Sequence, residues 1–267
     1  DRVYRFSHLI KAPGVEFNTA FSATELSPML AEEFPEIETY ARFIPTNTGE
    51  LTFQNETFRE SDIFYTDPGA TKVFTLDFLE GNSESALSEP LSVIISKDIS
   101  ERLFGNGSAI NKIIEIEGRN LKITGVFENQ PENTHFKFQV LISGVAQREF
   151  AFQDGVFNSE ALWNPSCVNY ILMKPGFDKA QFLEKFKAFN EKYFMPFGNK
   201  INGEHHLRIQ KLAEIHYDKE KIEDDFAKGN PNNLVVFTII GFSILFLACI
   251  NYMNLSTARA GLRAREI

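Results

Sequence analysis

The sequence predicts an α+β fold, in which a split βαβ layer surrounds a mostly β insert and one membrane-spanning helix follows. Three observations lead to this prediction. Residues 1–45 and 166–218 each show a strand–helix–strand pattern. The segment 46–165 consists of short β-prone runs separated by turn residues, and a long uncharged apolar run closes the chain.

The first strand–helix–strand unit opens the chain. Residues 2–11 alternate in hydrophobicity, as a strand does, and one face carries Tyr4, Phe6, His8 and Ile10. Residues 25–37 repeat apolar side chains at helical spacing, at Leu26, Leu30, Phe34 and Ile37. Pro28 is tolerated only in the first helical turn, and Pro35 marks the end of the helix. Residues 38–44 are predicted to form the second strand.

The second unit has the same layout. Residues 166–174 form a β-prone run, and a helix over 175–194 begins at the capping pair Asp178 and Gln181. The apolar stripe of this helix consists of Phe182, Phe186, Phe189 and Tyr193. Residues 205–212 alternate again, with two side chains facing inward, Leu207 and Ile209. Two such units can pair into one ferredoxin-like layer.

The insert, residues 46–165, is predicted to be a mostly β subdomain. Its β-prone runs are 50–55, 56–66, 91–96, 111–117, 120–127 and 137–143. The sequence "EGRN" at 117–120 joins two alternating runs and predicts a tight hairpin. One short helix is predicted over 97–105, with Ser96 as its N-cap and Gly105 as its stop.

The terminal segment differs from the rest, because no residue from Gly229 to Ala258 carries a formal charge. Its apolar part, 234–250, extends to about 20 residues with Tyr252 and Met253, enough to span a hydrocarbon core. We therefore predict a membrane helix over 233–253. The alternative is a buried core helix, which is unusual for a helix so apolar on every face. The predicted membrane-spanning side chains are Leu234, Phe237, Ile240, Phe242, Leu245, Leu247 and Ile250.

Charged flanks predict the orientation of this helix. Its C-terminal side carries three basic residues against one acid, namely Arg259, Arg263 and Arg265 against Glu266. The preceding segment, 218–229, holds more acid than base. The positive-inside rule then places 254–267 in the cytoplasm and residues 1 to about 230 outside, with 219–232 as a linker. Because no signal peptide opens the sequence, we expect an earlier membrane helix upstream of Asp1.

Charge and cysteine usage exclude two function classes. The net charge of −9 argues against nucleic acid as a partner, because phosphate binding requires clustered Lys and Arg. Cys249 lies inside the apolar run, so Cys167 has no intradomain partner. The sequence therefore contains neither a disulfide framework nor a Cys-x-x-Cys metal or redox pair.

The histidines do not predict a metal site. The chain has five, at positions His8, His135, His205, His206 and His216. His205 and His206 are adjacent in a predicted strand and point to opposite faces, so they cannot chelate one ion together. A site formed by His206, His216 and a carboxylate is the alternative. We favour histidines on a solvated surface and assign no metal ligand.

No catalytic or cofactor-binding residue is predicted either. The Gly-rich stretch 104–112 lacks the Gly-Lys-Ser/Thr ending of a phosphate loop, so we predict a turn before a hairpin. No Gly-x-Ser-x-Gly motif occurs, and Cys167 lies inside a strand. Trp163, the only tryptophan, is predicted to anchor the core or a subdomain junction, with a binding platform as the second interpretation.

Several stretches share the order of motifs found in one family. They are "DRVYR" (1–5), "VFTLDFLEGN" (73–82), "SEPLSVIISKDISERLFGN" (88–106), "IIEIEGRNLKITGVFENQPENTHFKFQVLIS" (113–143), "IQKLAEIHYD" (209–218) and "NYMNLSTARAGLRAREI" (251–267). The fourth contains Gly-Val-x-x-x-x-Pro-x-x-Thr-His, and the last contains Asn-x-x-Asn-Leu and ends in Arg-x-x-Glu-Ile. Together they resemble the MacB-like periplasmic core domain of FtsX-like ABC transporter permeases.

The resemblance implies a Porter-like subdomain, formed by 1–45 and 166–218, around a Sabre-like subdomain at 46–165. It also implies a homodimer or heterodimer of permeases in the bacterial inner membrane, each with four membrane helices. An ABC ATPase subunit would be the partner, since this chain contains no ATPase segment. A periplasmic adaptor and an outer-membrane channel are further partners that the resemblance leaves open.

The function implied by the resemblance is mechanotransmission, in which ATP hydrolysis inside the cell moves the outer domains during export or efflux. Residues 259–267 would then begin the cytoplasmic region that couples to the ATPase, and anchoring to lipid headgroups is the alternative for their arginines. Two other classes remain open. A receptor would continue past residue 267 into a coiled-coil or kinase-type module. A membrane-anchored hydrolase would need a pocket with paired, pKa-perturbed residues.

Overall fold

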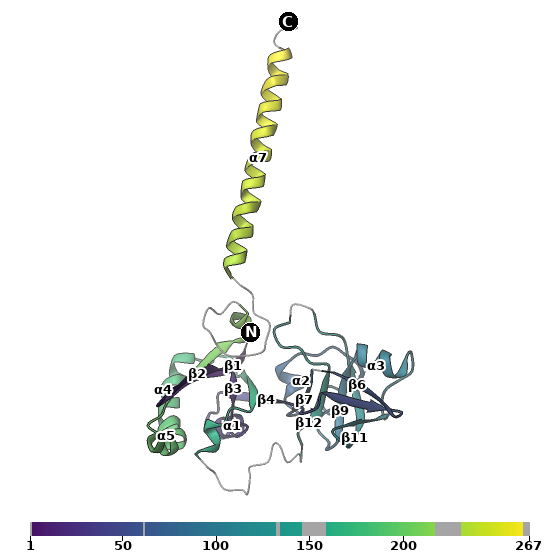
Figure 1. The fold of residues 1–267 in the computed structure, drawn as a ribbon, viewed down its shortest axis with the longest axis vertical. Coiled ribbons are helices and arrows are strands. Elements are labelled where there is room, and N and C mark those ends of the chain that lie inside the picture. Colours follow the sequence, from purple (N-terminus) through teal and green to yellow (C-terminus); the bar gives the residue numbers. More distant parts are fainter. Residues whose placement is uncertain (1, 61, 132–133, 146–158, 217–230, 264–267) are drawn as a thin grey trace. The chain divides into compact units, whose positions relative to one another are not determined.

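A computed structural model describes residues 2–60, 62–131, 134–145, 159–216 and 231–263 (Figure 1). The chain divides into two compact units, a globular one that runs to Ile215 and a second that contains the terminal helix. Each is described by itself. The predicted linker 219–232 lies mostly outside the described residues.

The secondary structure alternates short strands with a few helices. The strands are β1 (Val3–Ala12), β2 (Val15–Thr19), β3 (Phe21–Ser22), β4 (Ile37–Pro45), β5 (Glu50–Phe53), β6 (Glu56–Arg59), β7 (Ile63–Thr66), β8 (Phe78–Gly81), β9 (Ser92–Ser96), β10 (Ile113–Ile116), β11 (Arg119–Phe127), β12 (Val140–Ser143), β13 (Cys167–Met173) and β14 (Glu204–Lys211). The helices are α1 (Leu26–Glu33), α2 (Ala70–Val73), α3 (Lys97–Phe104), η3 (Ala161–Trp163), α4 (Lys179–Phe189), η4 (Asn190–Phe194), α5 (Met195–Ile201), α6 (Leu212–Ile215) and α7 (Pro231–Arg263).

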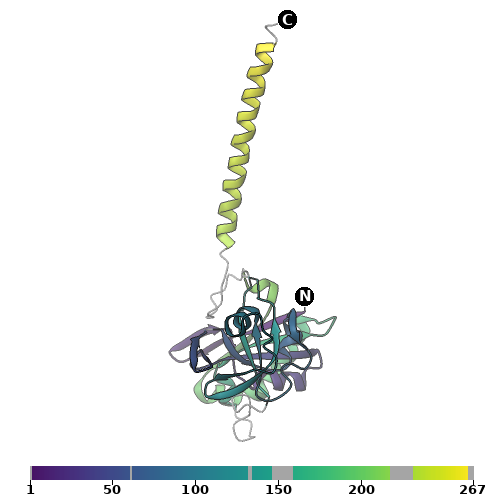
Figure 2. The same ribbon diagram turned by 90° about the vertical axis from the view of Figure 1, so that its right-hand side faces the viewer.

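The described strands belong to one 14-stranded sheet, seen from two directions in Figures 1 and 2. Its main path follows the order β14-β1-β13-β4-β7-β12-β9-β11-β10-β5-β6. Three short strands pair beside this path: β2 with β1, β3 with β13, and β8 with β11. The pairing of β4 with β7 joins the strands of the two terminal segments to those of the insert.

The first four strands of the path form the predicted ferredoxin-like layer. In the order β14-β1-β13-β4, every neighbouring pair is antiparallel, and α1 and α4 connect the outer strands to the inner ones. This is the split βαβ arrangement, so the predicted fold class is confirmed. Helices α1 and α4 bury their apolar stripes against one face of this layer, in a core that includes Tyr4, Phe6, Leu26, Leu30, Phe34, Ile171, Phe182, Phe186, Phe189 and Ile209.

The residues that were predicted to end or cap the helices of this layer do so. Helix α1 ends at Glu33, and its C-cap Phe34, just before Pro35, is extended (φ −117°, ψ 96°). The Asp178 carboxylate caps α4 by accepting from the backbone N–H groups of Ala180 and Gln181, at 2.8 and 3.1 Å. These bonds satisfy amides that have no partner inside the helix.

Two features of this layer were not predicted. After β1 the chain turns back through Gly14 (φ 79°) into β2 and then β3. The predicted helix over 175–194 ends its α-helical part at Phe189 and continues through the π-helical turn η4 into α5, as far as Ile201. A π-helical turn depends on tertiary partners for its displaced carbonyls, so its position is not visible in the apolar periodicity.

The insert strands follow the predicted runs closely. In the "EGRN" turn, Glu117 and Gly118 have φ values of 52° and 73°, as a two-residue type I′ hairpin requires. The Ser96 hydroxyl accepts from the Ile99 N–H at 3.4 Å at the start of α3, and Gly105 (φ 58°) ends that helix. The Gly-rich stretch after it is a turn before β10, as predicted.

Three predictions about the insert were incomplete. The run 56–66 divides into two strands, β6 and β7, which pair with different neighbours. A second short helix, α2, and the strand β8 also occur. Both are only four residues long, too short to produce a periodic signal.

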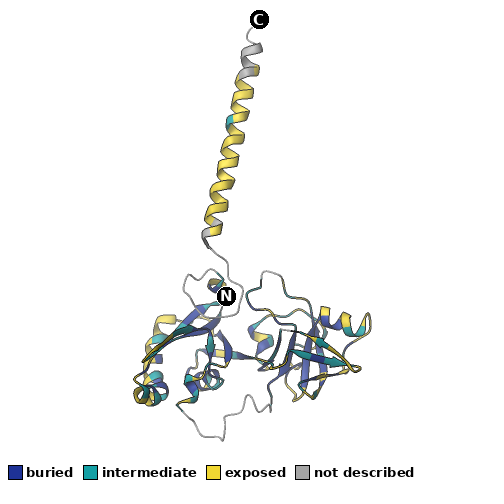
Figure 3. Cartoon of the chain, viewed as in Figure 1, coloured by how far each residue is buried: buried dark blue, intermediate teal, exposed yellow. Residues whose placement is uncertain are grey.

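The second unit contains α7, a helix of 33 residues. Its stretch Val235–Thr257 has a mean hydropathy of 2.2 and is long enough to cross a membrane. Figure 3 shows it coloured as exposed over nearly its whole described length. Apart from the half-buried Ile250, its described large apolar side chains are about half to three-quarters exposed, from 48% for Ile240 to 73% for Tyr252.

Candidate functional site

Strands β1 and β14 bring the beginning and the end of the globular unit together. Their antiparallel ladder runs from Tyr4↔Lys211 to Lys11↔Glu204. Helix α6 follows β14 directly, and its Ile215 is fully buried in the core shared with the insert. The first strand of this unit and its last strand are therefore hydrogen-bonded neighbours.

A buried chain of polar side chains crosses this ladder. Asn190 Oδ1 can only accept, so His205 donates to it from Nδ1 at 2.7 Å. His205 Nε2 then accepts from His8 Nδ1, also at 2.7 Å. His8 Nε2 accepts in turn from the Ser22 hydroxyl at 2.6 Å. Each ring nitrogen has one partner when both imidazoles are neutral.

Burial keeps these imidazoles neutral. His8 and His205 are only 2% and 4% exposed. Burial lowers the pKa of His8 to about 3. Burial, together with the nearby charges of His8 and His206, lowers the pKa of His205 well below its usual value. His206, for which a solvated surface was favoured over a metal site, is exposed, whereas His8 and His205 are buried.

The sequence did contain a signal for this pair. His8 alternates with the inward-facing Tyr4, Phe6 and Ile10, and His205 has the same parity as Leu207 and Ile209. Side chains two residues apart share a face of a strand. Both histidines were thus on core-facing positions, but their pairing across β1 and β14 depends on the register.

The Arg42–Asp67 ion pair lies at the pairing of β4 with β7, where the two halves of the sheet meet. Arg42 Nη2 and Nε donate to the Asp67 carboxylate at 2.6 and 2.9 Å, and the backbone N–H of Arg42 adds a bond of 2.8 Å. Burial alone would lower the pKa of Arg42, but the hydrogen bonds and charge of Asp67 outweigh burial and raise it. This ion pair was not predicted from the sequence.

An aromatic cluster surrounds the same junction. Phe43 on β4 contacts Phe136 at a ring-centroid distance of 4.8 Å and Phe74 at 5.6 Å. Tyr170 on β13 lies 5.9 Å from Phe43. The shared core therefore includes residues from the terminal segments and from the insert: Ala41, Phe43, Val168, Tyr170, Ala70, Leu87, Phe127, Phe136, Phe138 and Leu141.

Trp163 holds the segment in which the chain returns from the insert. Anchoring is the first of the two roles predicted for it. Its indole N–H donates to the Phe194 carbonyl at 3.0 Å. The Ser159 hydroxyl donates to the Tyr193 carbonyl at 2.6 Å. These two carbonyls belong to the π-helical turn η4. Side chains from outside the helix therefore provide hydrogen-bond donors for two of its backbone carbonyl groups.

The described residues offer little for chemistry. Within them, no three His, Cys, Asp or Glu side chains lie close enough together to hold a metal ion. Burial raises the pKa of the Cys167 thiol to about 12, which makes it a poor nucleophile. A cleft of about 200 Å³ opens in the insert, and its lining residues are 74–77, 128–131 and Thr134. The pKa-perturbed histidines and Cys167 are not among its lining residues.

The predicted membrane-spanning residues all lie on α7. Phe237, Phe242, Leu245 and Leu247 are exposed there by 59–69%, and Ile240 by 48%. Ile250 is half-buried, and Leu234 is part of the helix. Of the predicted flank, Arg259 is exposed and Arg263 ends the helix, whereas Arg265 and Glu266 lie outside the described residues.

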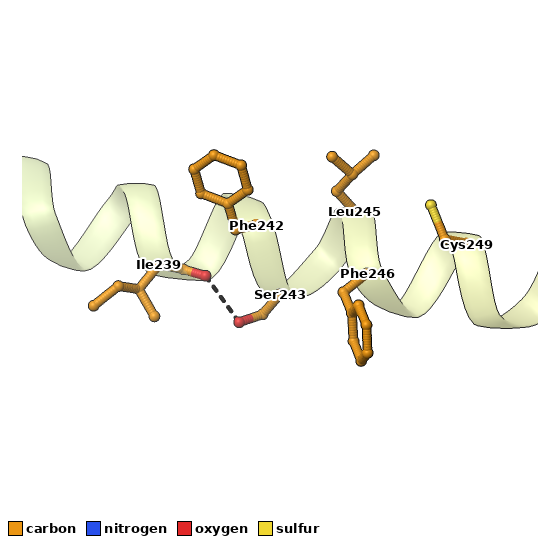
Figure 4. A pocket seen from close by; sticks show the side chains of 6 residues that line it. All are labelled: Ile239, Phe242, Ser243, Leu245, Phe246 and Cys249. Carbon is orange, nitrogen blue, oxygen red and sulfur yellow. Dashed lines mark hydrogen bonds between the residues drawn. The ribbon is translucent and has the colours of Figure 1, made fainter.

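One face of α7 carries mainly apolar side chains, which Figure 4 shows from close by. The face consists of Ile239, Phe242, Ser243, Leu245, Phe246 and Cys249. The only hydroxyl on it, that of Ser243, donates to the Ile239 carbonyl at 2.8 Å within the same helix. The polar group on this face is thus satisfied without water or another helix.

Comparison with known proteins agrees with this architecture. The family model of the MacB-like periplasmic core domain matches residues 2–189. A domain of a protein assigned as a permease from Porphyromonas gingivalis superposes with a TM-score of 0.64 at 18% identity, covering 88% of this chain and 96% of that one. The periplasmic region of MacB from Actinobacillus actinomycetemcomitans superposes with a TM-score of 0.52 at 11% identity, covering 80% and 90%.

A search of curated protein sequences finds no match. The matched model and the fold define the class of the globular unit, which is an extracytoplasmic domain of an ABC transporter permease. More particularly, the chain belongs to the family of MacB-like periplasmic core domains. This is a family of permease domains rather than of enzymes.

Proposed function

We propose that this domain transmits ATP-driven conformational change across the bacterial inner membrane during export or efflux. In this proposal residues 1 to about 230 are periplasmic, and α7 crosses the membrane. ATP is hydrolysed by an ABC ATPase subunit on the cytoplasmic side. The permease acts as a homodimer or heterodimer, and a periplasmic adaptor and outer-membrane channel are candidate further partners.

The observation that carries the proposal is the β1–β14 ladder. Its eight residue pairs join the first strand of the domain to β14, after which the chain continues toward α7. A displacement of α7 would pull along β14, and neighbouring hydrogen bonds resist such shear together. Movement at the membrane would therefore pass into the whole sheet.

The junction between the two halves of the sheet supports the same proposal. The buried Arg42–Asp67 ion pair and the Phe43 cluster connect β4 and β13 to the insert. Closely packed interiors transmit displacement because they have few voids into which side chains can relax. We propose that the Porter-like part (1–45 and 166–218) and the Sabre-like part (46–165) move as one body.

The C-terminal part provides the connection to the ATPase in this proposal. In this proposal the side chains that lie in the membrane are Leu234, Phe237, Ile240, Phe242, Leu245, Leu247 and Ile250. The flank Arg259, Arg263, Arg265 and Glu266 would begin the cytoplasmic coupling region. Basic side chains on the cytoplasmic end of a membrane helix agree with the positive-inside rule.

The test uses the full-length protein, extracted gently from its own membranes. One variant carries a flexible Gly/Ser spacer between Ile215 and Pro231, and the matched control carries the same spacer at Gly14, in the β1–β2 turn. A Cβ at Gly14 would meet nothing within 4 Å, so the hairpin has room for the insertion. We expect a stoichiometric ATPase to co-purify, and its turnover or the export it drives to fall only with the first spacer.

Two outcomes would overturn the proposal. If the ATPase turnover and the export it drives were equal in the two spacer variants, transmission through the connection between β14 and α7 would be excluded. A preparation without an ATPase, bound instead to a kinase or another regulator, would identify the domain as the sensor of a receptor.

A further inference from the structure

The imidazole chain (Ser22, His8, His205 and Asn190) lies at one end of the β1–β14 ladder. In that ladder His8 is paired with Leu207 and His205 with Ile10, so the two histidines are diagonal neighbours on one face. Their ring centroids are 5.0 Å apart. The imidazole chain therefore fastens the first half of β14 to β1, whereas the second half of β14 continues through α6 toward α7.

Aromatic rings close this pair of histidines off from water. The ring of Phe194 stacks on that of His205, with the centroids 3.8 Å apart and the planes 8° from parallel. The rings of Trp163 and Phe186 lie 6.0 and 6.3 Å from His205. A charge on either imidazole would have no water to solvate it, and burial of an unpaired charge is costly.

The elements packed against the two histidines offer no opposite charge. Among the described residues no carboxylate bonds to either ring, and the side chains that face the pair are uncharged. They are Thr19 from β2, Ser22 from β3, Phe186 from α4, Asn190 and Phe194 from η4, and Trp163 from η3. The nearest other titratable groups on β14 are His206 and Glu204, which pair with each other on the exposed face.

The hydrogen bonds of the imidazole chain leave no place for an additional proton. Only two ring nitrogens lack a proton, Nε2 of His8 and Nε2 of His205. A proton on His8 Nε2 would displace the hydrogen that Ser22 donates at 2.6 Å. A proton on His205 Nε2 would face the N–H of His8 Nδ1 across 2.7 Å, so the bond between the two rings would be lost. Each position leaves a buried cation without an anion.

We propose that the imidazole chain is an acid-sensitive latch, in which a proton taken up by His8 or His205 opens the ladder between residues 8–11 and 204–207. Opening brings the imidazolium into water and frees the side chain of Asn190 at the start of η4. Four of the eight residue pairs would then remain, those between 4–7 and 208–211. A shorter ladder resists shear less, so acid on the side of the membrane that holds the domain would weaken transmission. The inference rests on the proposed function, because it assigns the latch a role in that transmission.

The direction and the size of the effect follow from linkage. The pKa of His8 is about 3 in the closed ladder, and an open, solvated imidazole has its ordinary value of 6.5. The opening equilibrium is therefore nearly constant above pH 6.5 and rises as the pH falls toward 3. Through His8 alone it should rise about 25-fold between pH 7 and pH 5. His205, whose pKa burial also lowers, should add to this rise.

Amide hydrogen exchange of the full-length protein in detergent, followed by mass spectrometry at pH 7 and pH 5, tests the latch. Once exchange is corrected for its chemical rate, protection of residues 8–11 and 204–207 should fall at least about 20-fold in acid. Strands β9 and β12 in the insert are the internal reference and should keep their protection. The double variant His8→Gln with His205→Gln should abolish the loss, and the matched control His206→Gln on the exposed face should retain it. If the double variant does not fold, His8→Gln alone should still reduce the loss.

ATPase turnover in sealed membrane vesicles tests the role in transmission. The pH is lowered from 7 to 5 only on the side of the domain. Turnover, or the export it drives, should fall in the unmodified protein and in His206→Gln but less in His8→Gln. An acid-induced loss of protection that is absent, or that is equal over the whole globular unit, would overturn the inference. So would turnover that responds to acid equally in all three proteins.

The spacer variant between Ile215 and Pro231 separates this failure from failure of the proposed function. If that spacer lowers turnover while acid does not, the proposed function stands and the latch is wrong. If neither the spacer nor acid changes turnover, the proposed function fails together with the inference.

Discussion

The globular unit and α7 satisfy their polar groups in opposite ways. In the globular unit, His8, His205, Arg42 and Asp67 are buried and bonded to other side chains of the same unit. On α7 the apolar side chains are exposed, and the amides of Asn251 and Asn254 are exposed with them.

The difference indicates which of the two units forms the contacts of its polar side chains by itself. Most buried polar groups in proteins have hydrogen-bond partners, and for these four side chains the globular unit provides the partners internally. An exposed apolar helix of this length is long enough to cross a hydrocarbon core. Each prediction below tests one side of this contrast. Stability refers to unfolding of the globular unit in the detergent-solubilised full chain, followed by the fluorescence of Trp163, the only tryptophan.

The largest effect is expected from Asp67→Ala. The substitution leaves the guanidinium of Arg42 without its buried carboxylate, and breaking a buried ion pair costs about 3–5 kcal/mol. Urea unfolding should show this loss of stability. The matched control is Glu184→Ala, because Glu184 pairs with Lys187 on the surface, where both side chains are 72% exposed. It should change stability by less than about 0.5 kcal/mol.

A charge on the lipid-facing side of α7 should have the next largest effect. Phe242→Arg places a guanidinium in the apolar stretch, at a cost to membrane insertion of about 2.5–3.5 kcal/mol. The amount of protein in the membrane fraction should therefore fall, while Phe242→Leu should insert normally. Normal insertion of the arginine variant would indicate that this face of α7 contacts water or protein.

Acid should destabilise the globular unit through His8. Because folding lowers the pKa of His8 from 6.5 to about 3, its stabilisation is complete above pH 6.5 and is lost as the pH falls toward 3. Between pH 7 and pH 4 the free energy of unfolding should fall by about 3 kcal/mol.

The variant His8→Gln removes the contribution of His8 and should reduce the pH dependence below pH 6.5, while the buried His205 continues to contribute. The control His206→Gln changes an exposed ring and should leave it unaltered. Parallel curves for the unmodified protein and His8→Gln would contradict a role for the buried imidazole chain.

The smallest effect is expected from Gly198→Ala. A Cβ at this position would lie 2.7 Å from the indole ring of Trp163, so the ring must move. Overpacking of this kind costs about 1–3 kcal/mol. The contrasting change is Gly241→Ala on α7, where a Cβ would meet nothing within 4 Å. An unchanged unfolding curve for Gly198→Ala would show that Trp163 is not the anchor of η4 and α5.

Most of the fold could be predicted because its signals are local. Alternation predicted the strands β1 and β14, a β-prone run predicted β13, and apolar spacing with an Asp178 cap predicted the start of α4. The "EGRN" hairpin and the Ser96 cap follow from backbone preferences of a few residues. Short elements such as β3 and α2 were missed, because two to four residues are too few to show a period.

The sequence by itself determined the strand–helix–strand order of the split layer, the end of α1, the start of α4 and the apolar character of α7, since each follows from neighbouring residues. Only the tertiary structure decided that His8 meets His205 across 197 positions and that Arg42 meets Asp67 at the junction of the sheet. Those pairings depend on strand register, which sets residues distant in the chain side by side. Burial then turned an ordinary histidine pair into a neutral hydrogen-bonded chain, because a charge is costly in a site without water.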